Sequence, residues 1–152
     1  MNQTTIINKL NDLKYDGFKS AYLRQIEDTN YSKLSFDERV YNLLEAQEIF
    51  LQNKRISVNL RLSKIKDKQA SLEDIDYSSK RKIDKSIIKD LSNMNFIRNH
   101  HNVIISGCTG TGKSYLSQAL GNRAVIDGFR VYYIRIPTLL EEIKISRATG
   151  TY

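Results

Sequence analysis

Eight consecutive residues carry the clearest chemical signal in this chain: Gly107-Cys108-Thr109-Gly110-Thr111-Gly112-Lys113-Ser114. A glycine, four further residues and then Gly-Lys-Ser is the spacing of a phosphate-binding loop. The glycines permit backbone angles that side chains forbid, so that successive N–H groups can point inward at an anion. The loop therefore predicts a bound nucleoside triphosphate. Lys113 would reach the β- and γ-phosphates, and Ser114 would be a ligand of Mg²⁺.

The segments on either side of the loop fit this interpretation. Residues 102–106 predict a short buried strand that leads into the loop, and residues 115–120 predict the first turns of a helix that leaves it. That helix begins near Lys113, adds partial positive charge at its N-terminus and brings Tyr115 into the predicted binding set. The glycine spacing differs from that of the dinucleotide-binding pattern. A chance match in an unrelated turn is the alternative.

Composition narrows the class of protein. The 152 residues include 24 Lys and Arg against 17 Asp and Glu, and 40% of them are hydrophobic. A folded core is therefore expected, and the basic excess favours a polyanionic partner such as nucleic acid or nucleotide, with a solvated basic surface as the alternative. A single cysteine suits a reducing, cytoplasmic setting. No apolar run approaches the roughly 18 residues of a membrane span, so no membrane partner is expected.

The first half of the chain predicts helices. Residues 5–28 read as one or two short helices, with Gly17 as the break between them. A further helix is predicted to begin near Ser35, because Ser35 can cap it and Glu38 three residues later completes a capping box.

The same helix, or a second one, then becomes basic. Six cations and one acid lie between Lys54 and Lys68. Because a basic helix can follow the phosphates of a duplex, this segment predicts contact with double-stranded DNA. A solvated helix face is the commoner meaning of a charge run and remains the alternative. The predicted DNA-binding residues are Lys54, Arg55, Arg61, Lys64 and Lys66.

The second half predicts an α/β arrangement. Residues 72–77 read as an extended linker, residues 79–93 as a helix and residues 130–136 as a second strand rich in β-branched and aromatic side chains. Pro137 is expected to open a last helix over residues 138–146. Strand, helix, strand, helix predicts a parallel sheet with a right-handed crossover. His100 and His101 read as surface turn residues and not as metal ligands.

With these elements in place, the chain resembles the IstB/DnaC-like branch of the AAA+ ATPases, the helper proteins of bacterial transposons and the related helicase loaders. The similarity covers nearly the whole chain. It combines the helix start at 34–39, the linker at 72–77 and the loop at 107–114 with Ala119-Leu120-Gly121 after it. The order of helical domain, acidic-aromatic linker and loop is far more specific than the loop alone.

This resemblance implies a fold class, domains and partners. The predicted fold is α/β: an all-helical N-terminal domain (1–70) that contacts DNA, a linker and helix (71–101), and an incomplete P-loop NTPase sheet of the AAA+ type (102–152). ATP and Mg²⁺ are the implied cofactors, and a transposase or replicative helicase is the implied partner of a homo-oligomer formed by the full-length protein. Asp76 and Tyr77 are implied to lie near the nucleotide base, although a core anchor is the commoner role of such a tyrosine.

Hydrolysis needs more than this loop, namely a strand-borne acid that helps to hold Mg²⁺ and a residue that orients water. We find no such strand between residues 115 and 152 and expect these elements beyond Tyr152, so that hydrolysis by this chain is doubtful. The alternatives are a DNA-binding module without ATPase activity and a DnaC-like helicase loader. A small metabolite kinase is disfavoured, because a long helical segment precedes the loop.

Overall fold

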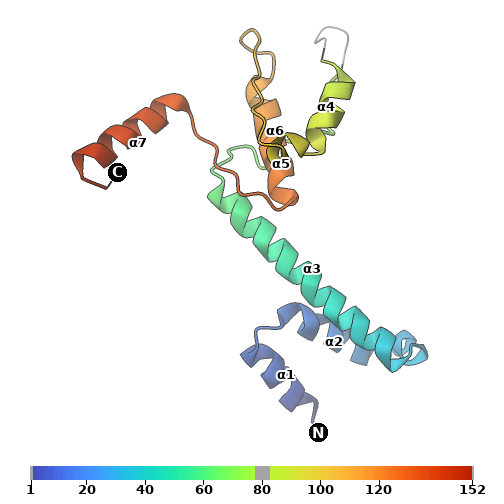
Figure 1. Ribbon diagram of the computed structural model, residues 1–152. Coiled ribbons are helices and arrows are strands. Elements are labelled where there is room, and N and C mark those ends of the chain that lie inside the picture. The colour runs from blue at the N-terminus through green and yellow to red at the C-terminus, as the bar shows by residue number, and fades with distance from the viewer. Residues whose placement is uncertain (1, 78–82, 152) are drawn as a thin grey trace. The chain divides into compact units, whose positions relative to one another are not determined.

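The computed structural model describes residues 2–77 and 83–151, and these residues form helices joined by loops (Figure 1). The chain divides into two compact units, Met1–Arg55 and Ile56–Tyr152, and each is described on its own. The helices are α1 (Gln3–Asp12), α2 (Asp16–Glu27), the 3-10 helix η1 (Thr29–Lys33), α3 (Phe36–Leu62), α4 (Lys85–Ser92), α5 (Asn95–Arg98), α6 (Lys113–Ile126) and α7 (Ile136–Ala148).

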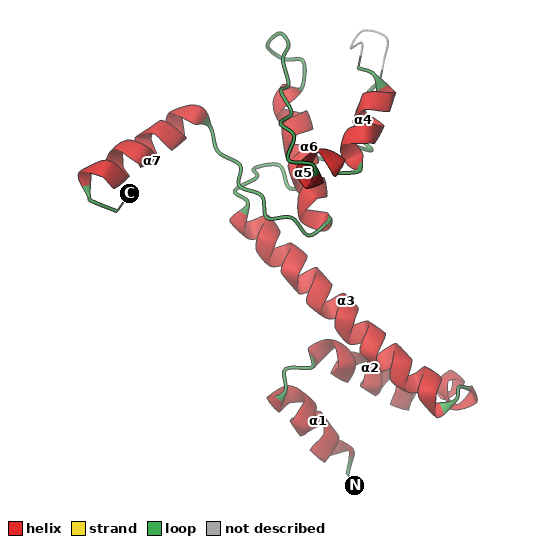
Figure 2. Ribbon diagram, viewed as in Figure 1, coloured by secondary structure: helices red, strands yellow, loops and turns green. Residues whose placement is uncertain are grey.

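The predicted parallel sheet, and with it the α/β fold class, is wrong. Neither segment 102–106 nor segment 130–136 contains a strand, and no other described residue does (Figure 2). A high β-propensity means that a segment suits a pleated, half-buried surface, whereas a strand exists only where a second backbone supplies ladder hydrogen bonds. Neither segment has such a partner in the described part of the chain. Tyr133, for example, donates its N–H to the carbonyl of Ser63, in the loop after α3 (2.6 Å).

The helix break in the first unit lies a few residues before its predicted position. α1 ends at Asp12, and Lys14 adopts a left-handed backbone (φ +58°) before α2 begins at Asp16. Gly17 is buried inside α2, where a Cβ atom would lie 2.5 Å from Cβ of Phe50 and 2.6 Å from the carbonyl of Ala46. The glycine is therefore present because α2 and α3 approach closely there, and not because the helix breaks.

Two buried glutamines fix the same pair of helices. Gln47 of α3 accepts a hydrogen bond from the backbone N–H of Phe18 in the first turn of α2 (3.0 Å). Gln25 of α2 donates to the carbonyl of Arg39 (2.9 Å) and accepts from the guanidinium of the same residue (3.4 Å). Because buried polar groups must find partners, these contacts favour one alignment of α2 on α3.

The predicted capping box at the start of α3 is confirmed. Ser35 donates its N–H and its hydroxyl to Oε2 of Glu38 (2.8 Å each), and the N–H of Glu38 lies 3.3 Å from the Ser35 hydroxyl. The backbone hydrogen bond from Ser35, with the hydroxyl second, holds the pKa of Glu38 below its ordinary value.

α3 ends at Leu62, before the predicted basic segment is complete. The next residue, Ser63, is fully buried, and its hydroxyl donates to the carbonyl of Leu60 (2.8 Å) and accepts from the N–H of Ile65 (3.2 Å). Lys64 then adopts a left-handed backbone (φ +56°), which stops a right-handed helix. Ile65, three residues past the helix end, is buried against α6 and not on the face of α3.

The second unit is built around α6. Its residues Ala119, Leu120 and Ala124 join a buried cluster with Ala70, Leu72, Ile88 and Met94. Ile105, next to the loop, and Val131 pack against this cluster from the two segments that were predicted as strands. The cluster therefore holds α6, and the loop at its N-terminus, without a sheet.

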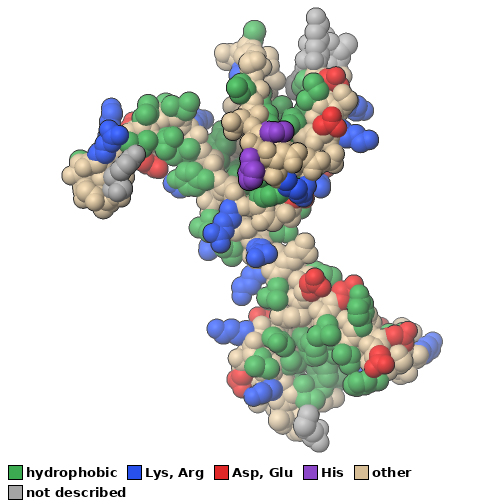
Figure 3. Space-filling model, in the orientation of Figure 1, with side chains coloured by type: hydrophobic (Ala, Val, Ile, Leu, Met, Phe, Trp, Pro, Cys, Tyr) green, Lys and Arg blue, Asp and Glu red, His purple; other side chains and the backbone are tan. Residues whose placement is uncertain are grey.

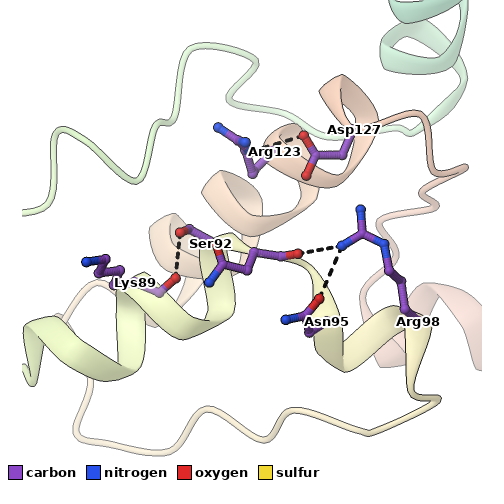
Figure 4. Close-up of polar contacts among 7 residues, drawn as sticks. Lys89, Ser92, Asn95, Arg98, Arg123 and Asp127 are labelled. Carbon is purple, nitrogen blue, oxygen red and sulfur yellow. Dashed lines mark hydrogen bonds and ion pairs between the residues drawn. The ribbon is translucent and has the colours of Figure 1, made fainter.

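The turn between α4 and α5 closes one side of this core (Figure 4). Met94 occupies the turn with a left-handed backbone (φ +54°) and a fully buried side chain. Arg98 donates to the carbonyl of Asn93 (2.7 Å) and to Oδ1 of Asn95 (3.3 Å), and its guanidinium lies 5.6 Å from the ring of Phe129. These contacts hold a backbone that a bulky side chain rarely adopts. The helix predicted over 79–93 is observed from Lys85, and residues 78–82 lie outside the described part of the chain.

The last helix agrees with its prediction. α7 begins at Ile136 with Pro137 in its first turn, where the missing N–H of proline costs no helical hydrogen bond. α7 has no buried residue, and hydrophobic side chains are exposed along it (Figure 3).

We predict that Gly17→Ala destabilises the chain by about 1–3 kcal/mol, because the new methyl group would overlap the backbone of α3. Urea-induced unfolding measures this change. Ser20→Ala is the matched control, since Ser20 is exposed on the same helix and bonds only to the carbonyl of Asp16. Equal stability of the two variants would contradict the close approach of α2 and α3.

We also predict a pH-dependent contribution from the capping box. The pKa of Glu38 is lower in the folded state than the ordinary value of 4.5. The carboxylate therefore stabilises the fold fully above about pH 4.5, and this contribution is lost as the pH falls through the folded pKa. Wild type should be more stable than Glu38→Gln at pH 7, and the difference should shrink at pH 3 in urea unfolding. A difference independent of pH would contradict the role of the charge.

Candidate functional site

The predicted phosphate-binding loop has the backbone that such a loop requires. Gly110 (φ +82°) and Gly112 (φ +88°) both adopt left-handed conformations that a side chain would strain. At Gly107 a Cβ atom would lie 3.2 Å from the hydroxyl oxygen of Thr111 and 3.8 Å from Cδ of Lys113. A side chain at position 107 would therefore crowd the hydroxyl of Thr111.

Two side chains of the loop meet at one carbonyl group. The hydroxyl of Thr111 donates to the carbonyl of Cys108 (2.8 Å), and the ammonium of Lys113 donates to the same oxygen (2.6 Å). The Lys113 side chain therefore turns back over the loop and does not extend into solvent. Its positive charge is held beside Cys108, whose thiol is exposed, as is the neighbouring residue Thr109.

The loop ends at the N-terminus of α6. Gly112 occupies the capping position, and no side chain caps the helix. The first N–H groups of α6 are therefore not occupied by a capping side chain, and a helix N-terminus attracts anions. Ser114, in the first turn, is exposed. This set of donors fits a triphosphate, with the Ser114 hydroxyl as the group that would hold Mg²⁺.

Tyr115 was predicted with the phosphate-binding residues, but its hydroxyl lies against the linker. The hydroxyl accepts a hydrogen bond from the N–H of Ser71 and donates to the carbonyl of Ser71 (3.2 Å each). The ring is partly buried and packs against the core cluster. The observed contacts of Tyr115 are therefore with the segment that precedes α4.

Two further residues of α6 bind the same segment, and neither was predicted. Oε1 of Gln118 accepts from the N–H groups of Lys66 (3.1 Å) and Asp67 (2.9 Å). Nδ2 of Asn122 donates to the carbonyls of Asp67 (2.9 Å) and Ala70 (2.8 Å). Residues 115, 118 and 122 follow the spacing of one helix face. Polar side chains at this spacing were the signal that could have revealed the contact.

The predicted DNA-binding cations are all exposed. Lys54, Arg55 and Arg61 lie on α3, whereas Lys64 and Lys66 follow its end. Lys54 and Arg55 belong to the first unit, and Arg61, Lys64 and Lys66 belong to the second.

Lys64 also has contacts within the second unit. Its ammonium donates to the hydroxyl of Tyr132 (2.5 Å), lies 4.8 Å from the centre of that ring and is 3.5 Å from a carboxylate oxygen of Glu142. The hydrogen bond to Tyr132, and then the charge of Glu142, raise the pKa of Lys64. The Lys64 ammonium therefore already has a hydrogen-bond acceptor and a carboxylate neighbour within the protein.

Tyr77 occupies the position of a core anchor. Its ring packs against the buried cluster, as expected for an amphipathic side chain, and the ammonium of Lys85 lies 5.1 Å from its centre. Both residues line a cavity of about 360 Å³ together with Leu72 and Ile88. These contacts are those of a tyrosine that anchors a segment to the core.

The described residues were also compared with the requirements of a metal site and of a membrane span. They contain no group of three or more His, Cys, Asp or Glu side chains that could hold a metal ion, and His100 and His101 are exposed. Among the described residues, no helix combines the length and hydrophobicity needed to cross a membrane.

Comparison with known proteins shows which family this chain is similar to. Residues 8–152 match the model of the family described as IstB-like ATP binding protein. A Pseudomonas fluorescens protein named "Insertion sequence IS1162 putative ATP-binding protein" is 34% identical over all of this chain and 65% of its own length. A Sinorhizobium fredii protein named "Putative insertion sequence ATP-binding protein y4pL" is 33% identical over 96% of this chain and 59% of its own length. The chain thus spans less than two thirds of these relatives, and it belongs to the IstB-like ATP-binding protein family.

Proposed function

We propose that this chain is an ATP-binding helper of DNA transposition, which binds ATP and Mg²⁺ through the loop 107–114 and duplex DNA through its basic segment. The observation that carries the proposal is the backbone of the loop, with an uncapped helix N-terminus behind it, in a chain of the IstB-like family. The printed names of the relatives connect them with insertion sequences and ATP, which supports the same assignment.

Each part of the loop has a separate task in this proposal. The N–H groups at the start of α6 and the Lys113 ammonium would bind the phosphate oxygens. To do so, Lys113 would exchange its hydrogen bond with the Cys108 carbonyl for a phosphate oxygen. Bound Mg²⁺ would neutralise phosphate charge, with the Ser114 hydroxyl as one ligand. We propose binding of ATP in this way, and not its hydrolysis.

The proposed DNA contact depends on phosphate charge and not on base sequence. The five predicted cations are exposed, and they lie on α3 or just after it. Cations on a helix bind the duplex backbone and give affinity that falls steeply with salt. A transposase or replicative helicase as protein partner, a homo-oligomer and a cytoplasmic location belong to the same proposal.

For ATP binding we predict that Lys113→Ala weakens the affinity for ATP–Mg²⁺ at least tenfold. A hydrogen bond to a charged group contributes about 1.5–3 kcal/mol, and 1.4 kcal/mol is a factor of ten. Isothermal titration calorimetry measures both proteins. Lys144→Ala is the matched control, since Lys144 is an exposed lysine on α7, outside the loop.

Equal affinity of wild type and Lys113→Ala would remove the ATP-binding proposal. If duplex DNA still bound with steep salt dependence, the DNA-binding module without use of ATP would then be the better assignment.

For DNA we predict that neutralising four cations weakens duplex binding and flattens its dependence on salt. Each lost phosphate contact lowers the slope of log K against log salt by about 0.9, so the slope should fall by up to about 3.6. Fluorescence anisotropy at several salt concentrations measures it. Lys64 is left in place because it contacts Tyr132. The variant carries glutamine at Lys54, Arg55, Arg61 and Lys66.

A second variant with the same loss of charge is the control for this experiment. If total charge alone governs binding, the two variants will have equal slopes, and the basic segment will have no special role. The control carries glutamine at the exposed residues Lys9, Lys14, Lys33 and Lys144.

A further inference from the structure

One amide group connects the phosphate-binding loop with the basic residues that follow α3. Nε2 of Gln118 donates to the carbonyl of Ser114, the last residue of the loop (3.0 Å). Oε1 of the same side chain accepts from the N–H groups of Lys66 and Asp67. The orientation of the amide is fixed chemically, because the reverse placement would set an NH₂ group against two N–H donors.

The segment bound by this amide, residues 63–71, is called the docked segment below. Tyr115, Gln118 and Asn122 together bond to six of its backbone N–H and carbonyl groups. Ile65 is buried in the same contact, and a Cβ atom on Gly121 of α6 would lie 2.9 Å from its Cδ1 atom. The backbone of the docked segment is therefore fixed to α6 by polar groups and by close packing.

The docked segment has positively charged side chains that are exposed to solvent. Lys64, Lys66 and Lys68 are exposed, while Ser63, Ile65 and Ala70 between and around them are buried. Two of these lysines belong to the predicted DNA-binding set. The same short segment thus presents cations to solvent and its backbone to the helix that begins at the loop.

We propose that Gln118 is a positioning residue that couples ATP at the loop to duplex DNA at the docked segment, so that each ligand raises the affinity for the other. This inference rests on the proposed function. ATP–Mg²⁺ on Ser114 restrains the residue whose carbonyl Gln118 holds, and the amide passes that restraint to the backbone of Lys66 and Asp67. Cations that are already ordered lose less entropy on binding phosphates, and the coupling is reciprocal.

The first test needs no variant. Hydrogen–deuterium exchange of the wild-type chain is measured with and without ATP–Mg²⁺. Slower exchange of the amides of Lys66, Asp67 and Ser71 on addition of ATP–Mg²⁺ is the expected result, because these N–H groups bond to Gln118 and Tyr115. Unchanged exchange there, with ATP bound, would overturn the coupling.

The second test measures the affinity of a fluorescent duplex with and without ATP–Mg²⁺. We expect the nucleotide to raise the affinity of wild type at least fivefold, the lower end of ordinary coupling. Gln118→Met keeps the length of the side chain and removes its hydrogen bonds. In this variant the ratio should fall to within twofold of one, while the affinity for ATP and the affinity for duplex without ATP each change less than threefold.

Ser117→Ala is the control that separates the hydrogen bond to the Ser114 carbonyl from the hydrogen bonds to the docked segment. The Ser117 hydroxyl also donates to the carbonyl of Ser114 (3.0 Å), but it makes no hydrogen bond to the docked segment. This variant should keep the wild-type ratio. A Gln118→Met ratio equal to that of wild type, or a wild-type ratio of one with both ligands bound, would overturn the inference. Failure of wild type to bind ATP or duplex at all would instead refute the proposed function, and the coupling with it.

Discussion

The second unit depends on the polar face of α6. A loop such as residues 66–71 carries N–H and carbonyl groups that must be satisfied wherever it is buried. Here those partners are the side chains of Tyr115, Gln118 and Asn122, and not a second backbone. Removing Asn122 would leave the buried carbonyl of Ala70 without this partner, which costs more than the hydrogen bond itself contributes. This constraint places the end of α3 beside the helix that carries the loop.

In the first unit, too, polar side chains bond to backbone groups of a neighbouring segment, and here both side chains are glutamines. Gln47 satisfies the N–H of Phe18 at the start of α2, where the first N–H groups of a helix lack internal partners. Gln25 donates an additional hydrogen bond to the carbonyl of Arg39 in the first turns of α3. Apolar contacts at Ala21 and Leu43 are not directional, so the glutamines decide how the two helices align. Gly17 then permits the close approach that this alignment requires.

Features set by neighbouring residues could be predicted from the sequence. The loop at 107–114, the capping box of Ser35 and Glu38, and Pro137 at the start of α7 each depend on a few adjacent residues. Features set by distant partners could not. The segments 102–106 and 130–136 have the composition of strands, but a ladder needs a partner that composition does not specify. Likewise, the role of Gly17 depends on Phe50, thirty-odd residues away in sequence, and the end of α3 depends on the burial of Ser63.

The geometry of the phosphate-binding loop is therefore independent of a sheet in the described residues. Its left-handed glycines and the N-terminus of α6 are local properties of residues 107–114. α6 itself is held from one side by the cluster around Leu120 and from another by the docked segment. An anion site needs oriented N–H groups and a nearby cation, and in the proposed site the N-terminus of α6 and Lys113 would supply them. Gln118 is thus one of the residues that hold the docked segment, with its exposed lysines, beside α6.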